Sequence, residues 1–180
     1  VKEGPALVIA PTSVGFNWLR ETERFAPSLT PHAYRETDRE EFLAQGVANT
    51  DVVVCSYGLA LRDASALANV EWGTLVLDEA QFIKNSRSKT AQAIRTIPAK
   101  WKLALTGTPM ENHLGELWSL FRTISPGVFG SWEQFRKRFA TPIEKQDDAG
   151  RRRALSKRIQ PFVLRRTKDE VLKDLPQRTE

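Results

Sequence analysis

The sequence contains few of the residues that build disulfides or metal sites. One of its 180 residues is a cysteine, Cys55, and two are histidines, His32 and His113. Cys55 lies inside the apolar run 51–57 and has no second cysteine to pair with, so a disulfide framework and a cysteine-based metal site are both excluded within this chain. The histidines are far apart in sequence, so we assign neither of them a metal. This composition is typical of a reducing, intracellular setting.

Long hydrophobic runs are also missing. The longest apolar runs have four or five residues, whereas a membrane-spanning helix needs roughly 20. No charged segment followed by an apolar one opens the chain, so nothing resembles a secretory signal. With 41% hydrophobic and 27% charged residues, we expect a soluble globular domain with its own core, alone or with an extension, and no membrane association.

Positive charge is concentrated in the last third of the sequence. The formal net charge is +5, and residues 131–180 hold 14 Lys and Arg against 8 Asp and Glu. Such a basic region is either a solvated helical face or a surface that faces phosphates, and charge alone does not choose between the two.

Four short apolar runs predict the strands of a parallel sheet, because they are continuous rather than alternating and mostly rich in valine or isoleucine. They are 6–10, 51–57, 74–79 and 102–107. The segment after the first run places Val14, Trp18 and Phe25 on one helical stripe. Ser13 is its expected N-cap, and 88–97 is predicted as a shorter helix. The order β, α, β, α, β predicts an open α/β sheet flanked by helices.

The chain changes character after Pro109, where amphipathic segments follow one another. Helical spacing predicts a first helix over 113–124 and a second over 132–139. A third helix, with a basic face, is predicted over 151–163. Residues 144–150 are predicted as a loop between the last two.

Small or polar residues follow each of the four apolar runs. In an open parallel sheet, ligands bind beyond the carboxyl ends of the strands, where loops and helix N-termini converge. Caps and turns would explain any one of these positions, but the set predicts a ligand site. The positions are Pro11, Thr12 and Ser13; Ser56, Tyr57 and Gly58; Asp78, Glu79, Ala80 and Gln81; and Thr106, Gly107, Thr108 and Pro109.

Asp78 and Glu79 carry side chains suited to phosphoryl transfer. An aspartate at the end of a buried strand can hold Mg²⁺, which prefers one or two carboxylates together with water and phosphate oxygens. The adjacent glutamate can accept a proton from a water that attacks a phosphate. An Asp-Glu pair also opens many ordinary helices, so the pair indicates a catalytic site only together with its surroundings.

The order of these segments resembles the SWI/SNF-related branch of the superfamily 2 helicase-type ATPases, which are DNA-dependent translocases. LVIAPTSVGFNWLRE resembles that branch's motif Ia, DVVVCSYG its motif Ib, and DEAQFIKN its motif II. TGTPMENHLGELWSLFRTISPGVFG resembles motif III with the helix after it, and PFVLRRTKDEVLKDLP resembles the segment that leads to the second lobe. The resemblance covers almost the whole chain and implies a RecA-like parallel sheet, of the P-loop NTPase type, followed by a helical extension.

The resemblance implies roles for the matching residues, with ATP and Mg²⁺ as cofactors. Asp78 would hold the Mg²⁺ of Mg-ATP, Glu79 would position and deprotonate the attacking water, and Gln81 would couple the nucleotide to the neighbouring strand end. Three residues of motif III would link the nucleotide state to lobe movement, namely Thr106, Gly107 and Thr108. Four residues would lie along double-stranded DNA and contact its phosphates without reading sequence, namely Thr12, Ser13, Ser56 and Tyr57.

Two parts of the family's site are absent from the sequence. None of the ten glycines is followed by lysine, so the phosphate-binding loop of motif I is missing. Nothing resembles the second lobe, which supplies arginines to the transferring phosphate. We therefore interpret the chain as part of a longer ATPase, with a partial first lobe over 1–110, a helical extension over 111–164 and a segment leading to the second lobe over 165–180. Taken alone, it is expected to hydrolyse ATP negligibly.

The expected partners of the parent protein are double-stranded DNA, a second RecA-like lobe and a DNA-bound protein complex. In the extension, residues 151–153, Arg165 and Arg166 are candidate contacts to phosphates or to that lobe, although the last two could instead cap a helix. Such a protein would work in the cytoplasm or nucleoid of a bacterium or in the nucleus of a eukaryote.

Two alternatives remain open. The chain could belong to another superfamily 2 member, such as an RNA helicase or a restriction-enzyme motor, but residues 115–130 and 161–172 fit the SWI/SNF pattern better. It could also be a degenerate lobe that is kept as a binding module. The intact pair Asp78 and Glu79 argues against that decay.

Overall fold

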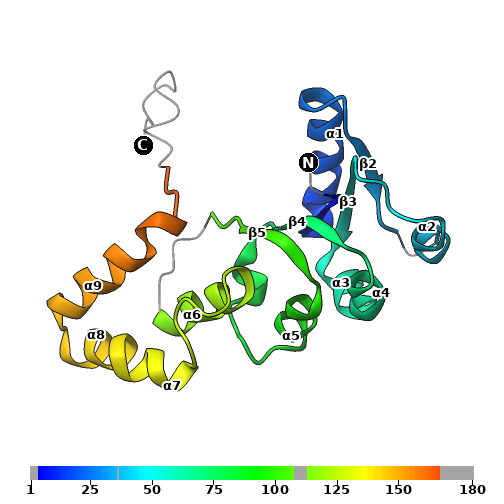
Figure 1. The fold of residues 1–180 in the computed structure, drawn as a ribbon. Coiled ribbons are helices and arrows are strands. Elements are labelled where there is room, and N and C mark those ends of the chain that lie inside the picture. Colours follow the sequence, from blue (N-terminus) through cyan, green and yellow to red (C-terminus); the bar gives the residue numbers. More distant parts are fainter. Residues whose placement is uncertain (1–3, 36, 108–112, 167–180) are drawn as a thin grey trace, which may run out of the picture.

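The computed structural model describes residues 4–35, 37–107 and 113–166. Its centre is a five-stranded parallel sheet with the strand order β2-β3-β1-β4-β5 (Figure 1). The strands are β1 (Ala6–Ala10), β2 (Thr30–Ala33), β3 (Asp51–Ser56), β4 (Trp72–Leu77) and β5 (Ala99–Ala104). The predicted α/β sheet is confirmed, and each of the four predicted strands overlaps an observed one. The last is displaced, because the strand predicted over 102–107 corresponds to β5 at Ala99–Ala104. The sequence does not predict β2, because Thr30–Ala33 is a short edge strand that contains proline and histidine rather than an apolar run.

The two faces of the sheet bury different residues, because side chains alternate along each strand. Leu7 and Ile9 belong to the larger core, on the face that carries α3 (Tyr57–Arg62), α4 (Ala64–Ala68) and α5 (Lys89–Thr96). Val8 and Ala10 pack on the opposite face, which α1 (Thr12–Phe25) covers over β2 and β3. In Figure 1, α1 rises above the sheet while α3, α4 and α5 lie below it. Both faces of β1, β3 and β4 are therefore buried, as their continuous apolar runs predict, whereas the residues of β5 are at most partly buried.

Helix α1 differs from its prediction at both ends. It begins at Thr12, with Pro11 in the N-cap position and no side-chain cap, so the expected N-cap at Ser13 is wrong. The chain becomes helical directly after Pro11, which leaves Ser13 inside the first turn. Phe25 was predicted on the packed stripe but is 69% exposed. It ends the helix, where its ring lies under the Arg24 guanidinium, 4.9 Å from the ring centroid.

Three short helices are not predicted by the sequence pattern: α2 (Arg39–Gln45), α3 and α4. Each has five to seven residues, which is less than the length over which a 3.6-residue hydrophobic period becomes visible. The 3₁₀ turn η1 (Ala80–Ile83) directly follows Glu79 and leads towards α5. It places the residues after Asp78 at the end of the sheet.

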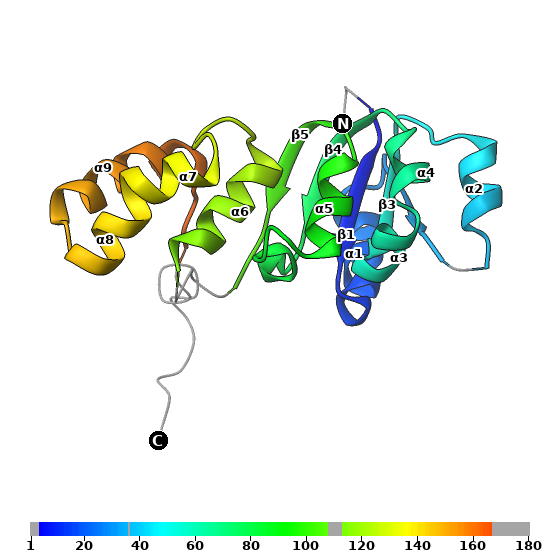
Figure 2. The same ribbon diagram turned by 90° about the horizontal axis from the view of Figure 1, so that it is seen from below.

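Beyond the sheet, helices build a second core. They are α6 (Leu114–Ile124), α7 (Trp132–Phe135), the π-helix η2 (Arg136–Ala140), α8 (Thr141–Gln146), α9 (Ala149–Ile159) and the 3₁₀ turn η3 (Gln160–Phe162). Their core contains Trp118, Phe121, Phe135 and Phe139, and Figure 2 shows these helices side by side at one end of the sheet. We call this unit the helical extension. In the part of the chain that the structure describes, no helix is long and apolar enough to cross a membrane.

The predicted loop over 144–150 is wrong in extent. Helix α8 continues to Gln146 and α9 begins at Ala149, so only Asp147 and Asp148 connect them. Asp147 adopts a left-handed conformation with φ 51°, and the Asp148 side chain caps α9 by accepting from the Arg151 N–H. Both residue types tolerate these turn positions, and two residues therefore suffice to reverse the chain.

Candidate functional site

Four strand ends meet at one edge of the sheet. The register pairs Ala10 with Ser56, Ile9 with Leu77, and Leu77 with Ala104. Backbone hydrogen bonds continue this alignment by one residue, because Asp78 N donates to Ile9 O and Leu105 N donates to Leu77 O, both at 2.8 Å. The polar residues that follow these strands therefore begin at the same edge of the sheet and at the same level, as expected for neighbouring parallel strands.

The carboxylate of Asp78 is held by two donors. Trp18 on α1 donates its Nε1–H to Asp78 Oδ2 at 2.8 Å, and the backbone N–H of Glu79 donates to Asp78 Oδ1 at 2.9 Å. The helical stripe in the sequence predicts Trp18 only as a packing residue. The signal that could have indicated its second role is the indole N–H, which needs an acceptor when the ring is packed against a sheet.

Glu79, Gln81 and Thr106 form one chain of hydrogen bonds across two strand ends. Gln81 Nε2 donates to Glu79 Oε2 at 2.9 Å, and Thr106 Oγ1 donates to Gln81 Oε1 at 3.3 Å. Glu79 adopts a left-handed conformation with φ 49° and ψ 54°, a geometry that costs non-glycine residues about 1–3 kcal/mol and concentrates at functional sites. Gly107 is exposed beside this chain, and Thr108 lies outside the described residues.

Tyr57 is buried and supports Asp78, so its hydroxyl is not presented at the surface. The side chain is 6% exposed, and its hydroxyl donates to the backbone carbonyl of Asp78 at 2.8 Å. Its ring stacks on Phe82 with the centroids 4.8 Å apart. Burial, followed by the negative charges of Asp78 and Glu79, raises the pKa of Tyr57 above its ordinary value, so the hydroxyl remains a donor. Tyr57 therefore links the end of β3 to the end of β4.

The remaining predicted DNA contacts lie at the ends of β1 and β3. Thr12 and Ser13 are exposed in the first turn of α1. Ser56 is partly buried and caps α3, because its Oγ accepts from the Leu59 N–H at 3.2 Å. Thr12 and Ser56 line the same cavity of about 330 Å³, together with Phe16 and Arg35. The structure thus brings Thr12 and Ser56 together, with a cationic side chain beside them.

The Asp78 carboxylate is suited to a magnesium ion that is held mainly by water and phosphate. Among the residues that the structure describes, each of its oxygens accepts one hydrogen bond, so each retains capacity for a further partner. Among the described residues, no group of three or more His, Cys, Asp or Glu side chains is placed to hold a metal. A site built from one carboxylate fits Mg²⁺ bound together with a nucleotide better than an ion in a cage of protein ligands.

Comparison with known proteins identifies relatives over nearly the whole chain. A family model described as the SNF2-related domain matches residues 2–180. A Bacillus subtilis protein named as an ATP-dependent helicase/translocase, YwqA, is 46% identical over 98% of this chain and 20% of its own length. The TATA-binding protein-associated factor MOT1 of Saccharomyces cerevisiae is 40% identical over 96% of this chain and 10% of its own length.

A solved structure shows the same fold. The Sulfolobus solfataricus SWI2/SNF2 ATPase core in complex with dsDNA has a TM-score of 0.85 and 40% sequence identity, over 97% of this chain and 36% of that one. The RecA-like fold class is confirmed. The present chain spans a fifth or less of the length of the two curated relatives. It belongs to the family of SNF2-related domains.

Proposed function

We propose that this chain forms part of the ATP-binding motor lobe of a DNA-dependent ATPase that translocates on double-stranded DNA and remodels protein–DNA complexes. The observation that carries this proposal is the hydrogen-bonded chain Glu79, Gln81 and Thr106 beside the held carboxylate of Asp78. It joins two strand ends at the edge where open parallel sheets bind ligands. The likeness to an ATPase core in complex with dsDNA supports the choice of substrate.

In this proposal Asp78 and Glu79 have separate tasks. Asp78 would hold the Mg²⁺ of Mg-ATP, and a bound Mg²⁺ would neutralise charge that develops on the phosphate oxygens. Glu79 orients the attacking water and accepts its proton at a carboxylate oxygen. Gln81 holds one oxygen of Glu79 at 2.9 Å, which leaves the other oxygen for the water. Gln81 and Thr106 transmit the state of the bound nucleotide to the end of β5. Gly107 and Thr108 link that state to movement of the lobes.

Trp18 and Tyr57 act as positioning residues for Asp78. Trp18 fixes one carboxylate oxygen, and Tyr57 fixes the backbone carbonyl of the same residue. Because both partners come from other elements, the orientation of Asp78 depends on how α1 and α3 are placed. Residues that orient a metal-binding side chain commonly change metal affinity or activity when they are replaced.

DNA is proposed to lie along the ends of β1 and β3. Thr12, Ser13 and Ser56 contribute hydroxyls or nearby backbone N–H groups to phosphates, which gives position without sequence readout. Arg35 adds a cation at the same cavity. The hydroxyl of Tyr57 is already bonded to Asp78. Tyr57 therefore contributes to the proposed DNA contact only through its position at the start of α3. Binding is therefore expected to depend on salt and to be indifferent to sequence.

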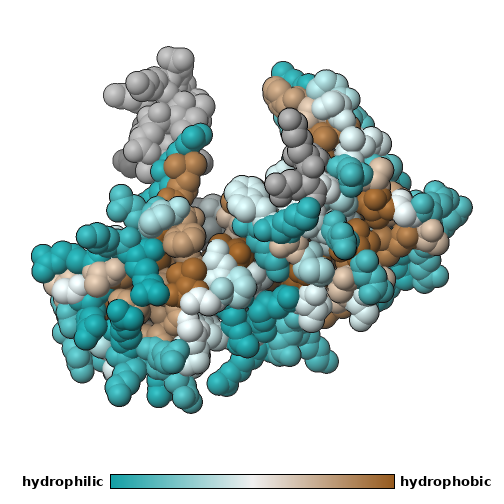
Figure 3. Space-filling view, viewed as in Figure 1, coloured by the Kyte–Doolittle hydropathy of each residue, from teal (hydrophilic) through white to brown (hydrophobic). Residues whose placement is uncertain are grey.

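A second RecA-like lobe is the proposed partner of the segment after α9. Phe162, Val163 and Leu164 are 52%, 46% and 78% exposed, and Figure 3 shows an apolar patch where the chain leaves α9. Exposed apolar side chains in succession indicate a surface that another unit covers. A DNA-bound protein complex is the proposed target of the motor, and a DNA substrate implies an intracellular setting.

The decisive experiment uses the longer protein that contains this chain. Glu79→Gln removes the proton acceptor while keeping the shape, so DNA-stimulated ATP hydrolysis should fall by about 10²- to 10⁴-fold. DNA affinity, measured by fluorescence anisotropy with a labelled duplex, should remain the same. Glu23→Gln, an exposed change of equal charge on α1, is the matched control. Undiminished hydrolysis in Glu79→Gln would overturn the proposal.

A further inference from the structure

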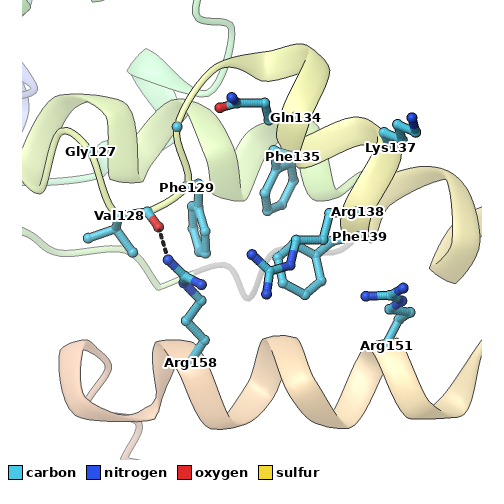
Figure 4. Close-up of a pocket in the computed structure, with 11 residues that line it drawn as sticks. Gly127, Val128, Phe129, Gln134, Phe135, Lys137, Arg138, Phe139, Arg151 and Arg158 are labelled. Atoms are coloured by element: carbon cyan, nitrogen blue, oxygen red, sulfur yellow. Dashed lines mark hydrogen bonds between the residues drawn. The ribbon is translucent and has the colours of Figure 1, made fainter.

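The helical extension contains a groove that the motor function does not explain. The groove has a volume of about 600 Å³ and lies between the loop 127–130, the α7–η2 segment and α9 (Figure 4). Its apolar part consists of Val128 and the rings of Phe129, Phe135 and Phe139. Cavities of this size are typical of sites for small molecules or a few side chains of a peptide.

The other lining side chains are mostly cations. Lys137, Arg138, Arg151 and Arg158 line the groove, and no carboxylate does so within the described residues. Arg152 of α9 pairs with the carboxylate of Asp147, but Arg152 does not line the groove. Figure 4 shows the guanidinium groups of Arg138 and Arg158 directed into the space between α9 and the phenylalanine rings, with Arg151 at one end. The groove therefore gathers positive charge that the described residues do not neutralise.

The loop over the groove is fixed in place. Arg158 Nη2 donates to Val128 O at 2.7 Å, and Trp118 Nε1 donates to Gly130 O at 3.2 Å. Gly127 and Gly130 have φ values of 99° and 67°, which side chains other than glycine rarely adopt. These contacts form the groove without a ligand, so a ligand would bind a prepared surface.

A π-helix forms one wall. The wider turn over Arg136–Ala140 continues directly from α7, and such turns are rare and often mark functional sites. It buries Phe139 to 4% exposure while leaving Arg138 at the surface, with the guanidinium 5.3 Å from the Phe139 ring centroid. The π-helix thus places the Arg138 cation directly beside the apolar ring of Phe139.

We propose that this groove binds an acidic peptide segment of a partner protein, with a bulky apolar side chain between its carboxylates. Arg138, Arg151 and Arg158 would receive the carboxylates, and the edge of Phe129 beside Val128 would contact the apolar side chain. Duplex DNA fits less well, because it presents a convex surface of phosphates and cannot bring an apolar group to the floor of a groove. The proposal does not depend on the ATPase mechanism.

The test measures binding of a short fluorescein-labelled peptide, in which aspartate and glutamate alternate with leucine and tryptophan, by fluorescence anisotropy. The double variant Arg138→Glu/Arg151→Glu reverses charge in the groove. Lys145→Glu/Lys157→Glu makes the same charge change on exposed positions of α8 and α9 outside it. We expect the groove variant to weaken binding by at least about tenfold and the control by less than about threefold. Circular dichroism checks that both variants are folded.

Two further probes separate the contributions. A peptide with alanine in place of leucine and tryptophan should bind at least about fivefold more weakly, because it lacks the apolar contact. An unlabelled DNA duplex should compete poorly for the groove. Equal weakening by both charge variants, equal binding of the alanine peptide, or displacement of the peptide by duplex DNA that depends on Arg138 and Arg151 would each overturn the proposal.

Discussion

At the scale of single residues, the indole N–H of Trp18 is the contact whose removal tests how Asp78 is oriented. Trp18→Phe keeps an aromatic ring on α1 but deletes the donor to Asp78 Oδ2. In the longer protein we expect DNA-stimulated ATP hydrolysis to fall by about tenfold and to need more Mg²⁺. A Mg²⁺ titration of the hydrolysis rate measures both effects. Trp101→Phe, at a tryptophan that is 61% exposed on β5, is the control, and equal losses in the two variants would contradict the prediction.

The two tyrosines of the chain provide a pH signal at the same scale. Burial raises the pKa of both Tyr34 and Tyr57, and nearby carboxylates, including Asp63 for Tyr34, add to the rise. A tyrosine in the unfolded chain ionises near pH 10, so this contribution to stability is complete below about pH 10 and is lost as the pH rises further. We expect tyrosinate absorbance to appear together with loss of the circular dichroism signal. Tyrosinate in a chain that is still folded at about pH 10 would show that the rings are accessible.

At the scale of elements, one buried hydrogen bond joins the helical extension to η1, the turn that follows Asp78 and Glu79. Ser119 on α6 is fully buried, and its hydroxyl donates to Ile83 O at the end of η1 at 2.7 Å. Ser119→Ala would leave that carbonyl without its donor, so we expect a loss of about 1–3 kcal/mol in the free energy of unfolding. Urea denaturation measures the loss. Ser156→Ala, at an exposed position of α9, should change stability by less than about 0.5 kcal/mol.

Elements with a strong pattern could be predicted from the sequence, and elements defined by tertiary contacts could not. The apolar runs around Leu7 and Leu75 identify central strands because both faces of those strands are buried. The edge strand β2 lacks that burial and therefore lacks the signal. The position of Asp78 at a strand end follows from the same runs, but its bonds to Trp18 and Tyr57 depend on how α1 and α3 pack on the two faces of the sheet. Spacing along the chain contains no information on such contacts.

At the scale of the whole molecule, the chain would supply one side of the proposed nucleotide site. Asp78 and Glu79 are held in place, but no glycine in the sequence precedes a lysine, so no loop of the kind that holds the β- and γ-phosphates is available. Arginines from a second lobe, which stabilise charge in the transition state, are likewise not recognisable in the sequence. The two carboxylates alone therefore have little to act on.

The isolated chain is accordingly expected to hydrolyse ATP no faster with DNA than without it, at a rate close to that of buffer. Phosphate release from the purified 180 residues, with and without a DNA duplex, measures this. The matched comparison is Glu79→Gln, which should give the same background, because a proton acceptor contributes only when the phosphates are bound beside it. DNA-stimulated turnover that disappears in Glu79→Gln would show that these residues bind and hydrolyse ATP unaided. The held geometry of Asp78 would then be sufficient for catalysis, rather than one half of a site.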